Sequence, residues 1–165
     1  MRKAIFAGTF DPITKGHEDL VFRALSFFDE VVVTIAENPE KKTLFSIEQR
    51  LDFIRTVFDG DKRVSVASCN GLTGDFAKSL GAKFLLRGVR SISDFEYERS
   101  LAEINQTLFP DLETVMLFSS APFSGISSSV VREVLRHKVD VSMWVSEKIV
   151  SRLRCVAGAD INSDC

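Results

Sequence analysis

Short apolar runs alternate along this chain with longer segments whose apolar residues recur at the spacing of an amphipathic helix. Runs rich in β-branched and aromatic residues are typical of buried strands, and strands separated by helices are typical of parallel sheets. The pattern therefore predicts an α/β fold, a doubly wound five-stranded parallel sheet with helices on both faces. The expected strands are 4–7, 31–36, 64–66, 83–86 and 114–118, and the expected helices are 18–28, 46–58, 72–80, 94–108, 127–136 and one that begins after Ser146.

The chain is long enough for one Rossmann-like domain with a sizeable core, because 45% of its 165 residues are hydrophobic. We expect that domain, with its last helix, to cover residues 1–155, and the polar residues 156–165 to form a flexible tail. Ser46 and Gln49 form the sequence pattern of a capping box, which predicts that a helix begins there.

The charge balance excludes some classes of partner. The net charge is −2, and no apolar run approaches the ~18 residues of a membrane span. We therefore expect no nucleic-acid partner and no membrane association, and a cytoplasmic location. The three cysteines do not show the spacing of a metal site.

A parallel sheet brings the segments after its strands to one edge. These segments contain two arginines, two lysines, one histidine and a run of serines that opens a helix. Such a set is suited to a polyphosphate. The segments expected to share one cleft are 9–17, 37–42, 69–73, 87–90 and 119–129.

The first of these segments is a strand-to-helix turn. We expect Gly8 to let the backbone approach a ligand, and Gly16 and His17 to open a helix whose N-terminus attracts phosphate. Taken alone, a single histidine near a helix start is more often structural than catalytic. The small neighbours of His17 and the hydroxyl of Thr9 favour a site in which a cationic or hydrogen-donating imidazole holds a phosphate. For Asp11, next to a proline, the turn interpretation is preferred over a metal site.

Other charged residues allow two interpretations. An arginine at a sheet edge, such as Arg87 or Arg90, needs a partner, and phosphate supplies one. The pair Lys41-Lys42 is either a solvated loop or a set of point charges over a substrate. Glu98 is either a solvated helix carboxylate or a site residue, and His137 is expected to stabilise a helix end.

Four segments together carry a resemblance to a known family. Gly8-Thr9-Phe10-Asp11-Pro12 with Thr14-x-Gly16-His17, then Arg87-Gly88-Val89-Arg90, then Asp94-Phe95-Glu96-Tyr97-Glu98, then Ile126-Ser127-Ser128-Ser129 with Arg132 occur in this order. The chain resembles the nucleotidyltransferases of the HxGH superfamily and, among them, the bacterial phosphopantetheine adenylyltransferases. One departure is that Phe123-Ser124-Gly125 stands where the family often has a tryptophan.

The resemblance implies transfer of the adenylyl group of ATP to 4′-phosphopantetheine, which gives dephospho-coenzyme A and pyrophosphate in coenzyme A biosynthesis. It implies direct in-line attack without a covalent enzyme intermediate, and Mg²⁺ held mainly by ATP phosphates and water. A homohexamer and feedback inhibition by coenzyme A are likewise implied. The implied catalytic residues are His17, Thr9, Lys41 and Arg90. The implied substrate-binding residues are Thr9, Lys41, Thr73 and Arg87. The implied ATP-binding residues are Thr9, Phe10, His17, Gly88, Val89, Arg90, Glu98, Phe123, Ser124, Gly125, Ile126, Ser127, Ser128 and Ser129.

Two other functions remain open at this point. Enzymes acting on glycerol phosphate, nicotinate mononucleotide or choline phosphate share the first and last of these signatures, so the acceptor could differ. A nucleotide-binding regulatory module that has lost catalysis is the non-enzymatic alternative.

Overall fold

The predicted parallel sheet is present. A computed structural model describes residues 1–37 and 42–156 of the chain. The five strands lie in the order β3-β2-β1-β4-β5, and each neighbouring pair is parallel. The fold class expected from the sequence is therefore confirmed. The strands are β1 (Lys3–Gly8), β2 (Glu30–Ala36), β3 (Val64–Cys69), β4 (Phe84–Val89) and β5 (Glu113–Phe118).

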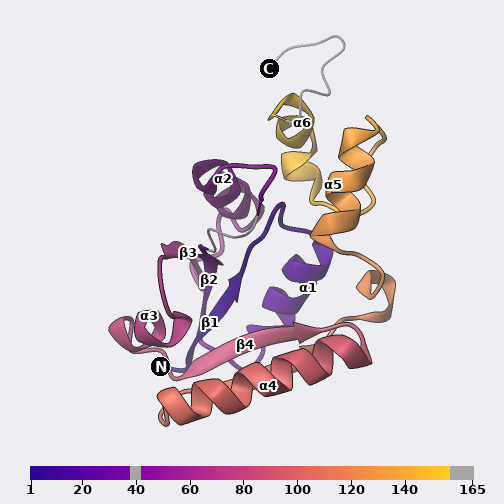
Figure 1. Ribbon diagram of the computed structural model, residues 1–165. Coiled ribbons are helices and arrows are strands. Elements are labelled where there is room, and N and C mark those ends of the chain that lie inside the picture. The colour runs from indigo at the N-terminus through magenta and orange to yellow at the C-terminus, as the bar shows by residue number, and fades with distance from the viewer. Residues whose placement is uncertain (38–41, 157–165) are drawn as a thin grey trace.

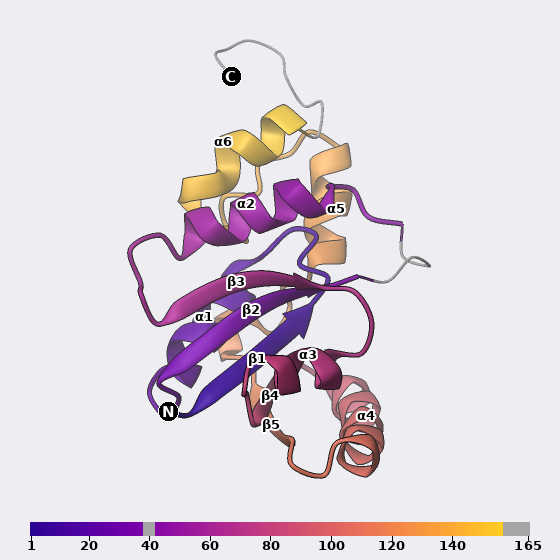
Figure 2. The same cartoon turned by 90° about the vertical axis from the view of Figure 1, so that its left-hand side faces the viewer.

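Helices follow the strands and cover both faces of the sheet (Figures 1 and 2). They are α1 (Lys15–Ala24), α2 (Ile47–Val57), α3 (Thr73–Ser79), α4 (Ile92–Leu108), α5 (Ser128–Arg136) and α6 (Glu147–Val156), with a 3₁₀ turn, η1 (Ala121–Phe123). Figure 2 shows α2 and α6 on one side of the sheet and α3 and α4 on the other.

Alternate residues of the central strands enter two different cores. Phe6 and Val33 belong to the larger core, which the helices α1, α2, α5 and α6 complete. Ile5 and Val32 belong to the smaller core, with Ala77 of α3. Successive strand residues point to opposite faces, so a continuous apolar run is required when both faces are covered.

One strand differs from its predicted extent in a way that matters for the site. β4 was expected to end before Arg87, but it continues to Val89 because its pairing with β5 continues through Arg87↔Met116 and Gly88↔Leu117. Arg87 and Gly88 are thus strand residues, and only Arg90 follows the strand.

Helix starts follow the local capping chemistry. The capping box of α2 is confirmed, since the Ser46 N–H donates to Gln49 Oε1 at 2.9 Å and the Gln49 N–H donates to Ser46 Oγ at 3.3 Å. Helix α1 begins at Lys15 with Thr14 as its N-cap and ends at Ala24, so it is shifted towards the N-terminus relative to the expected 18–28. This shift places His17 within the first turn.

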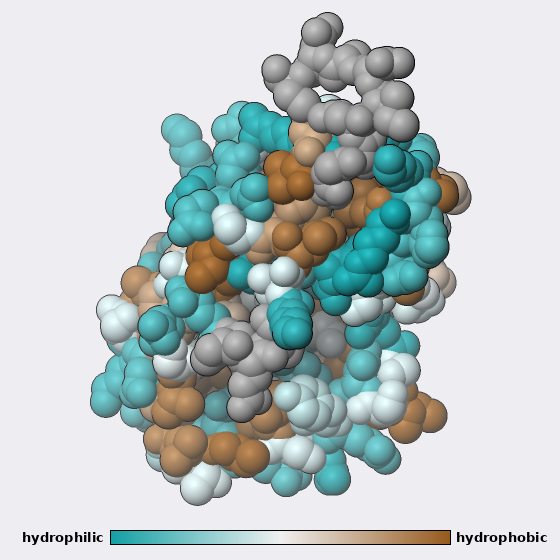
Figure 3. Space-filling view, turned by 45° about the horizontal axis from the view of Figure 1, so that its top comes forward, coloured by the Kyte–Doolittle hydropathy of each residue, from teal (hydrophilic) through white to brown (hydrophobic). Residues whose placement is uncertain are grey.

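The fold has an uneven distribution of buried residues. β1 and β2 are almost entirely buried, whereas α4 contains no buried residue. The surface seen in Figure 3 is mostly hydrophilic, with hydrophobic residues in groups between the hydrophilic ones.

Among the described helices, none has the length and apolar character needed to cross a membrane.

The C-terminal helix α6 reaches Val156, one residue beyond the boundary expected for the domain. The rest of the expected tail lies outside the described residues. The single domain over 1–155 stays a prediction.

Candidate active site

A cavity of about 450 Å³ lies at the carboxyl ends of β1 and β4. Four of the five segments expected to meet there contribute to its wall, together with α4. The lining includes Thr9, Phe10, Asp11, Thr14 and His17 after β1; Lys42 and Thr43 after β2; Arg87, Gly88 and Arg90 at β4; Glu98 on α4; and Phe123, Ile126, Ser127, Ser128, Ser129 and Arg132 after β5.

Several expected site residues do not line this cavity. Thr73, the first residue of α3, lies in the one segment that the cavity does not reach. Val89, the last residue of β4, is buried, and Ser124 and Gly125 are exposed beside η1. Lys41 lies outside the described residues.

His17 is held in one orientation by the start of its own helix. The Thr14 N–H donates to His17 Nδ1 at 3.1 Å, and the Thr14 hydroxyl lies 2.9 Å from the same nitrogen. Because Nδ1 accepts the backbone hydrogen bond, the neutral ring must carry its proton on Nε2. The imidazole therefore offers an N–H donor on its other side.

The ring of His17 is neutral at physiological pH. Burial and then the positive charge of Arg90 lower the pKa of His17 from 6.5 to about 4. Of the two forms expected from the sequence, cationic or hydrogen-donating, the structure supports the neutral donor.

Phe10 packs against His17 from an unusual backbone conformation. Its φ is +46°, which a bulky residue adopts only where the surroundings enforce it. The Phe10 ring is buried edge-to-face against Phe6 and His17, with centroids 5.2 and 5.1 Å away. A Cβ on Gly8 would lie 3.1 Å from the Phe10 ring. Gly8 therefore makes room for Phe10, and it also lines the cavity, where the sequence predicted the approach of a ligand.

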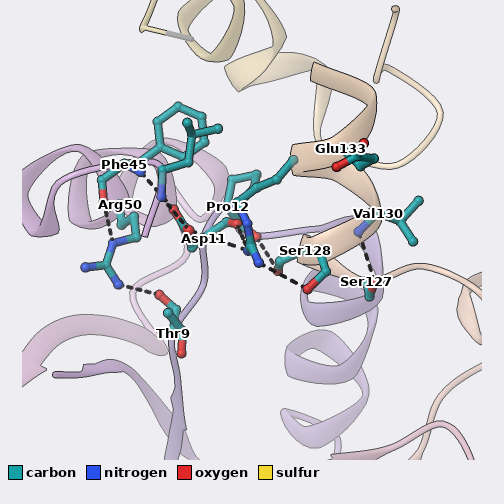
Figure 4. A network of polar contacts seen from close by, with 12 residues as sticks. Thr9, Asp11, Pro12, Phe45, Arg50, Ser127, Ser128, Val130 and Glu133 are labelled. Atoms are coloured by element: carbon teal, nitrogen blue, oxygen red, sulfur yellow. Dashed lines mark hydrogen bonds and ion pairs between the residues drawn. The ribbon is translucent and has the colours of Figure 1, made fainter. Parts of the chain in front are cut away.

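Asp11 fixes the first loop to two other parts of the chain (Figure 4). Its carboxylate, only 1% exposed, accepts hydrogen bonds from the Leu44 and Phe45 N–H groups at 2.8 and 3.0 Å. Arg132 of α5 donates to the Asp11 carbonyl at 2.6 Å and lies 3.4 Å from Asp11 Oδ2. The sequence predicted that Asp11 holds its own turn. In the structure its carboxylate instead holds the first loop to residues that are distant in the chain.

Arg50 of α2 is a second fixing point that sequence reasoning missed. Its side chain is buried and donates from Nη1 to the Thr9 carbonyl at 2.7 Å and from Nε to the Phe45 carbonyl at 3.1 Å (Figure 4). The only available signal was its position four residues after the N-cap Ser46, which does not reveal a partner in another loop. Arg132 could have been singled out, because it belongs to the last of the four sequence signatures.

Arg87 and Glu98 form a paired unit in the cavity wall. Arg87 Nε and Nη2 donate to the two oxygens of Glu98 at 2.6 and 2.8 Å, and Nη1 donates to the Ala7 carbonyl at 2.8 Å. Arg90 instead pairs with Asp94 at 3.0 Å and reaches the Ile126 carbonyl at 3.4 Å. Both arginines expected in the cleft are there, each already oriented by a carboxylate of α4.

The three serines at the start of α5 have three separate contacts. Ser127 is the N-cap and accepts from the Val130 N–H at 3.2 Å. Ser128 donates to the Pro12 carbonyl at 2.8 Å, and Ser129 accepts from Arg132 at 3.1 Å. The first main-chain N–H groups of α5 have no acceptor within the helix, so they are also available to a ligand.

Comparison with known proteins agrees with this arrangement. A cytidylyltransferase-like family model matches residues 5–134. The phosphopantetheine adenylyltransferase of Flavobacterium johnsoniae is 49% identical over 149 residues, which are 90% of this chain and 97% of that protein. The enzyme of the same name from Nitrosomonas eutropha is 45% identical over 154 residues, 93% of this chain and 94% of that protein.

The chain belongs to the phosphopantetheine adenylyltransferase family.

A solved structure supports the fold independently of this family. A bifunctional NMN adenylyltransferase/ADP ribose pyrophosphatase from Francisella tularensis, in complex with AMP and a manganese ion, superposes with a TM-score of 0.66 at 16% identity. The match covers 95% of this chain and 48% of that one. At this identity the likeness concerns the fold alone.

The charges of the cavity suit the anionic substrates of an adenylyltransferase family. Its described lining contains four cationic side chains, Lys42, Arg87, Arg90 and Arg132, and two carboxylates, Asp11 and Glu98. Both carboxylates already form ion pairs with arginines, Glu98 with Arg87 and Asp11 with Arg132. Among the described residues, no cluster of three or more His, Cys, Asp or Glu side chains could hold a metal ion.

Proposed function

We propose that this chain transfers the adenylyl group of ATP to 4′-phosphopantetheine, giving dephospho-coenzyme A and pyrophosphate in coenzyme A biosynthesis. The observation that carries the proposal is the position of the His17 imidazole in one cavity with Arg87, Arg90 and the start of α5. Membership of the phosphopantetheine adenylyltransferase family supports the choice of acceptor.

The reaction needs no protein nucleophile. An oxygen of the 4′-phosphate attacks the α-phosphorus of ATP in line. The new phosphorus–oxygen bond forms as the bond between the α-phosphorus and the oxygen that bridges it to the β-phosphorus breaks. Pyrophosphate leaves with that oxygen. Catalysis then depends on positioning and on stabilising the charge that grows on the α-phosphate.

His17, Thr9, Lys41 and Arg90 would stabilise that charge. The Nε2–H of His17 is suited to donate to an α-phosphate oxygen, because Thr14 occupies Nδ1. Arg90 is anchored between the segments after β4 and β5, where it would bind ATP phosphates. The role of Lys41 rests on the family pattern.

The remaining residues would divide between the two substrates. On the acceptor side we assign Arg87, Thr9, Lys41 and Thr73, the last at the start of α3. On the ATP side we assign the lining residues of the first loop and of α5, and Phe123 as an aromatic contact for adenine. The full ATP-side set is Thr9, Phe10, His17, Gly88, Val89, Arg90, Glu98, Phe123, Ser124, Gly125, Ile126, Ser127, Ser128 and Ser129.

Mg²⁺ fits this site as part of the nucleotide. The carboxylates of the cavity, Asp11 and Glu98, are engaged with arginines, so ATP phosphates and water would supply the oxygen ligands that Mg²⁺ prefers. The ion would neutralise charge on the leaving pyrophosphate.

We further propose a homohexamer and inhibition by coenzyme A, both from the family pattern. Light scattering of the purified protein tests the first. The second predicts that coenzyme A lowers the rate in competition with phosphopantetheine. A monomer in solution, or a rate that is insensitive to coenzyme A, would contradict the respective proposal.

The function is tested by mixing the protein with ATP, Mg²⁺ and phosphopantetheine and detecting dephospho-coenzyme A by mass. Glycerol 3-phosphate, nicotinate mononucleotide and choline phosphate are the comparison acceptors. An adenylylated product from one of them alone would assign a different acceptor. Binding of ATP without pyrophosphate release from any acceptor would identify a regulatory module instead.

A further inference from the structure

Helix α1 presents one side to the segment that joins β5 to α5. Gly16, Asp19 and Arg23 are spaced by three and four residues along α1, so they share that side of the helix. A Cβ on Gly16 would lie 3.5 Å from the Cβ of Phe123. Further along the helix, Asp19 and Arg23 both contact Ser120. The segment after β5 is therefore attached to α1 at two places (Figure 1).

The second of these contacts is a closed ring of hydrogen bonds. The Ser120 hydroxyl donates its one proton to Asp19 Oδ2 at 2.7 Å, and its oxygen accepts from Arg23 Nη1 at 3.2 Å. Arg23 Nη1 closes the ring to Asp19 Oδ2 at 3.3 Å and also donates to the carbonyl of Phe118, the last residue of β5, at 2.8 Å. The side chains of Asp19, Arg23 and Ser120 do not line the cavity, so the ring holds the segment from outside the site.

Ser120 connects this ring to the cavity wall. It is the N-cap of η1, a position where a serine hydroxyl usually accepts a hydrogen bond from its own turn. Here the hydroxyl makes no cap bond and contacts α1 instead. The Ser120 carbonyl accepts from the Phe123 N–H at 2.8 Å, and Phe123 lines the cavity. Fixing Ser120 against α1 therefore fixes the position of Phe123.

We propose that Asp19, Arg23 and Ser120 are positioning residues for the adenine of ATP. They hold η1 against α1, and so fix Phe123 relative to the helix that carries His17, without contacting the nucleotide. The inference rests on the proposed function, because it takes Phe123 as the aromatic contact for adenine. A loop that is ordered before binding loses less conformational freedom when the ligand arrives. Opening the ring should therefore weaken binding of the base and spare the phosphates.

The first test compares Ser120→Ala with Ser79→Ala, which removes a serine hydroxyl bonded to the Phe76 carbonyl of α3, outside the cavity lining. Isothermal titration with Mg²⁺ measures the Kd of ATP, of phosphopantetheine and of pyrophosphate, which binds without a base. We expect Ser120→Ala to raise the Kd of ATP about fivefold, the scale of one hydrogen bond, and to leave the other two within about twofold. Ser120→Thr, which keeps the hydroxyl, should restore the affinity for ATP, and Ser79→Ala should change none of the three.

Two changes at Asp19 separate positioning from charge. Asp19→Asn keeps an oxygen that can accept from the Ser120 hydroxyl, whereas Asp19→Ala removes the acceptor. Both remove a negative charge, so an effect of charge alone would tighten the binding of anionic ATP in both variants. We expect instead that Asp19→Ala raises the Kd of ATP about tenfold and that Asp19→Asn stays within about twofold of the wild type. Asp52→Ala, which also removes the carboxylate of an aspartate–arginine pair, should leave the Kd of ATP unchanged.

Two results overturn the inference. One is a wild-type Kd of ATP in both Ser120→Ala and Asp19→Ala. The other is an equal loss of affinity for pyrophosphate, which would show that the ring acts on the phosphate side of the site. Thermal unfolding identifies a misfolded variant, and if Asp19→Ala does not fold, the comparison of Ser120→Ala with Ser120→Thr decides. These titrations need no turnover. Failure of the wild-type protein to form dephospho-coenzyme A therefore overturns the proposed function and is distinct from any result of the titrations.

Discussion

The two walls of the cavity are held in different ways. The wall formed by the β1–α1 loop is anchored by buried groups: Asp11 is 1% exposed and Arg50 is 5% exposed. The wall formed by β4 and α4 is anchored by ion pairs at partly exposed side chains, on a helix without a buried residue. The polar contacts of the first wall are therefore buried, whereas those between β4 and α4 are partly exposed.

This difference has an energetic consequence. Removing one partner of a buried, hydrogen-bonded ion pair leaves the other partner uncompensated, which strongly destabilises a protein. Removing one partner of an exposed pair changes stability little. Changes in the β1 wall should therefore reduce both stability and activity, whereas changes in the β4 wall should alter substrate affinity in a protein that remains folded.

The largest expected effect is at Asp11. Asp11→Ala would leave the Leu44 and Phe45 N–H groups without their acceptor and would remove the carboxylate that lies 3.4 Å from Arg132 Nη1. We expect the free energy of unfolding in urea to fall by about 3–5 kcal/mol. The matched control is Asp52→Ala, which removes an exposed aspartate–arginine pair of 2.6 Å between α2 and α6 and should change stability by less than about 1 kcal/mol. Equal losses in the two variants would contradict the distinction between the walls.

The next effect is catalytic. His17→Ala should lower kcat by about 10²–10³ because it removes a preorganised donor to the α-phosphate. His137→Ala is the control, since that histidine lies exposed at the end of α5 beside Glu133. Steady-state kinetics measures both, with circular dichroism to verify folding. Turnover of His17→Ala near the wild-type value would refute the proposed role.

The lowered pKa of His17 predicts a pH effect on stability. In the native protein the pKa is about 4, against 6.5 in the unfolded chain, so below about pH 6.5 the unfolded chain takes up a proton that the native ring does not. The stability that this difference in the pKa of His17 contributes is fully present above pH 6.5 and is lost as the pH falls towards 4. We expect wild-type protein to lose about 2 kcal/mol more than His17→Gln between about pH 7.5 and about pH 5. Parallel pH dependences of the unfolding free energy in the two proteins would exclude this shift.

The smallest expected effect separates the contribution of Ser127 to stability from its contribution to ATP binding. Ser127→Ala removes the N-cap hydrogen bond to the Val130 N–H and should cost about 1 kcal/mol of stability. Ser46→Ala removes the equivalent cap of α2, outside the cavity lining, and should cost about the same. Only Ser127→Ala is expected to raise the KM for ATP, by about two- to fivefold as for the loss of one neutral hydrogen bond. An equal KM in both variants would show that Ser127 acts only as a cap.

Local sequence patterns were sufficient to predict the position of many site residues. Gly16 and His17 at a helix start, Ser46 with Gln49, and the serines of α5 lie where their sequence patterns predicted. The extent of β4 was predicted wrongly, because whether Arg87 belongs to the strand depends on pairing with β5. Gly8 lines the cavity, where the sequence predicted the approach of a ligand, and its missing side chain also makes room for the ring of Phe10, which the sequence did not reveal.

The sequence by itself determined that the sheet is parallel, that helices connect its strands and that the loops after the strands meet at one edge. These features follow from periodicity and from the length of the connections. Only the tertiary structure decided which charges meet. Arg50 and Thr9, Arg132 and Asp11, and Arg87 and Glu98 are separated by 41, 121 and 11 residues. Such pairings depend on how helices and strands pack against one another and on the rotamers that this packing allows, and no local pattern of residues encodes them.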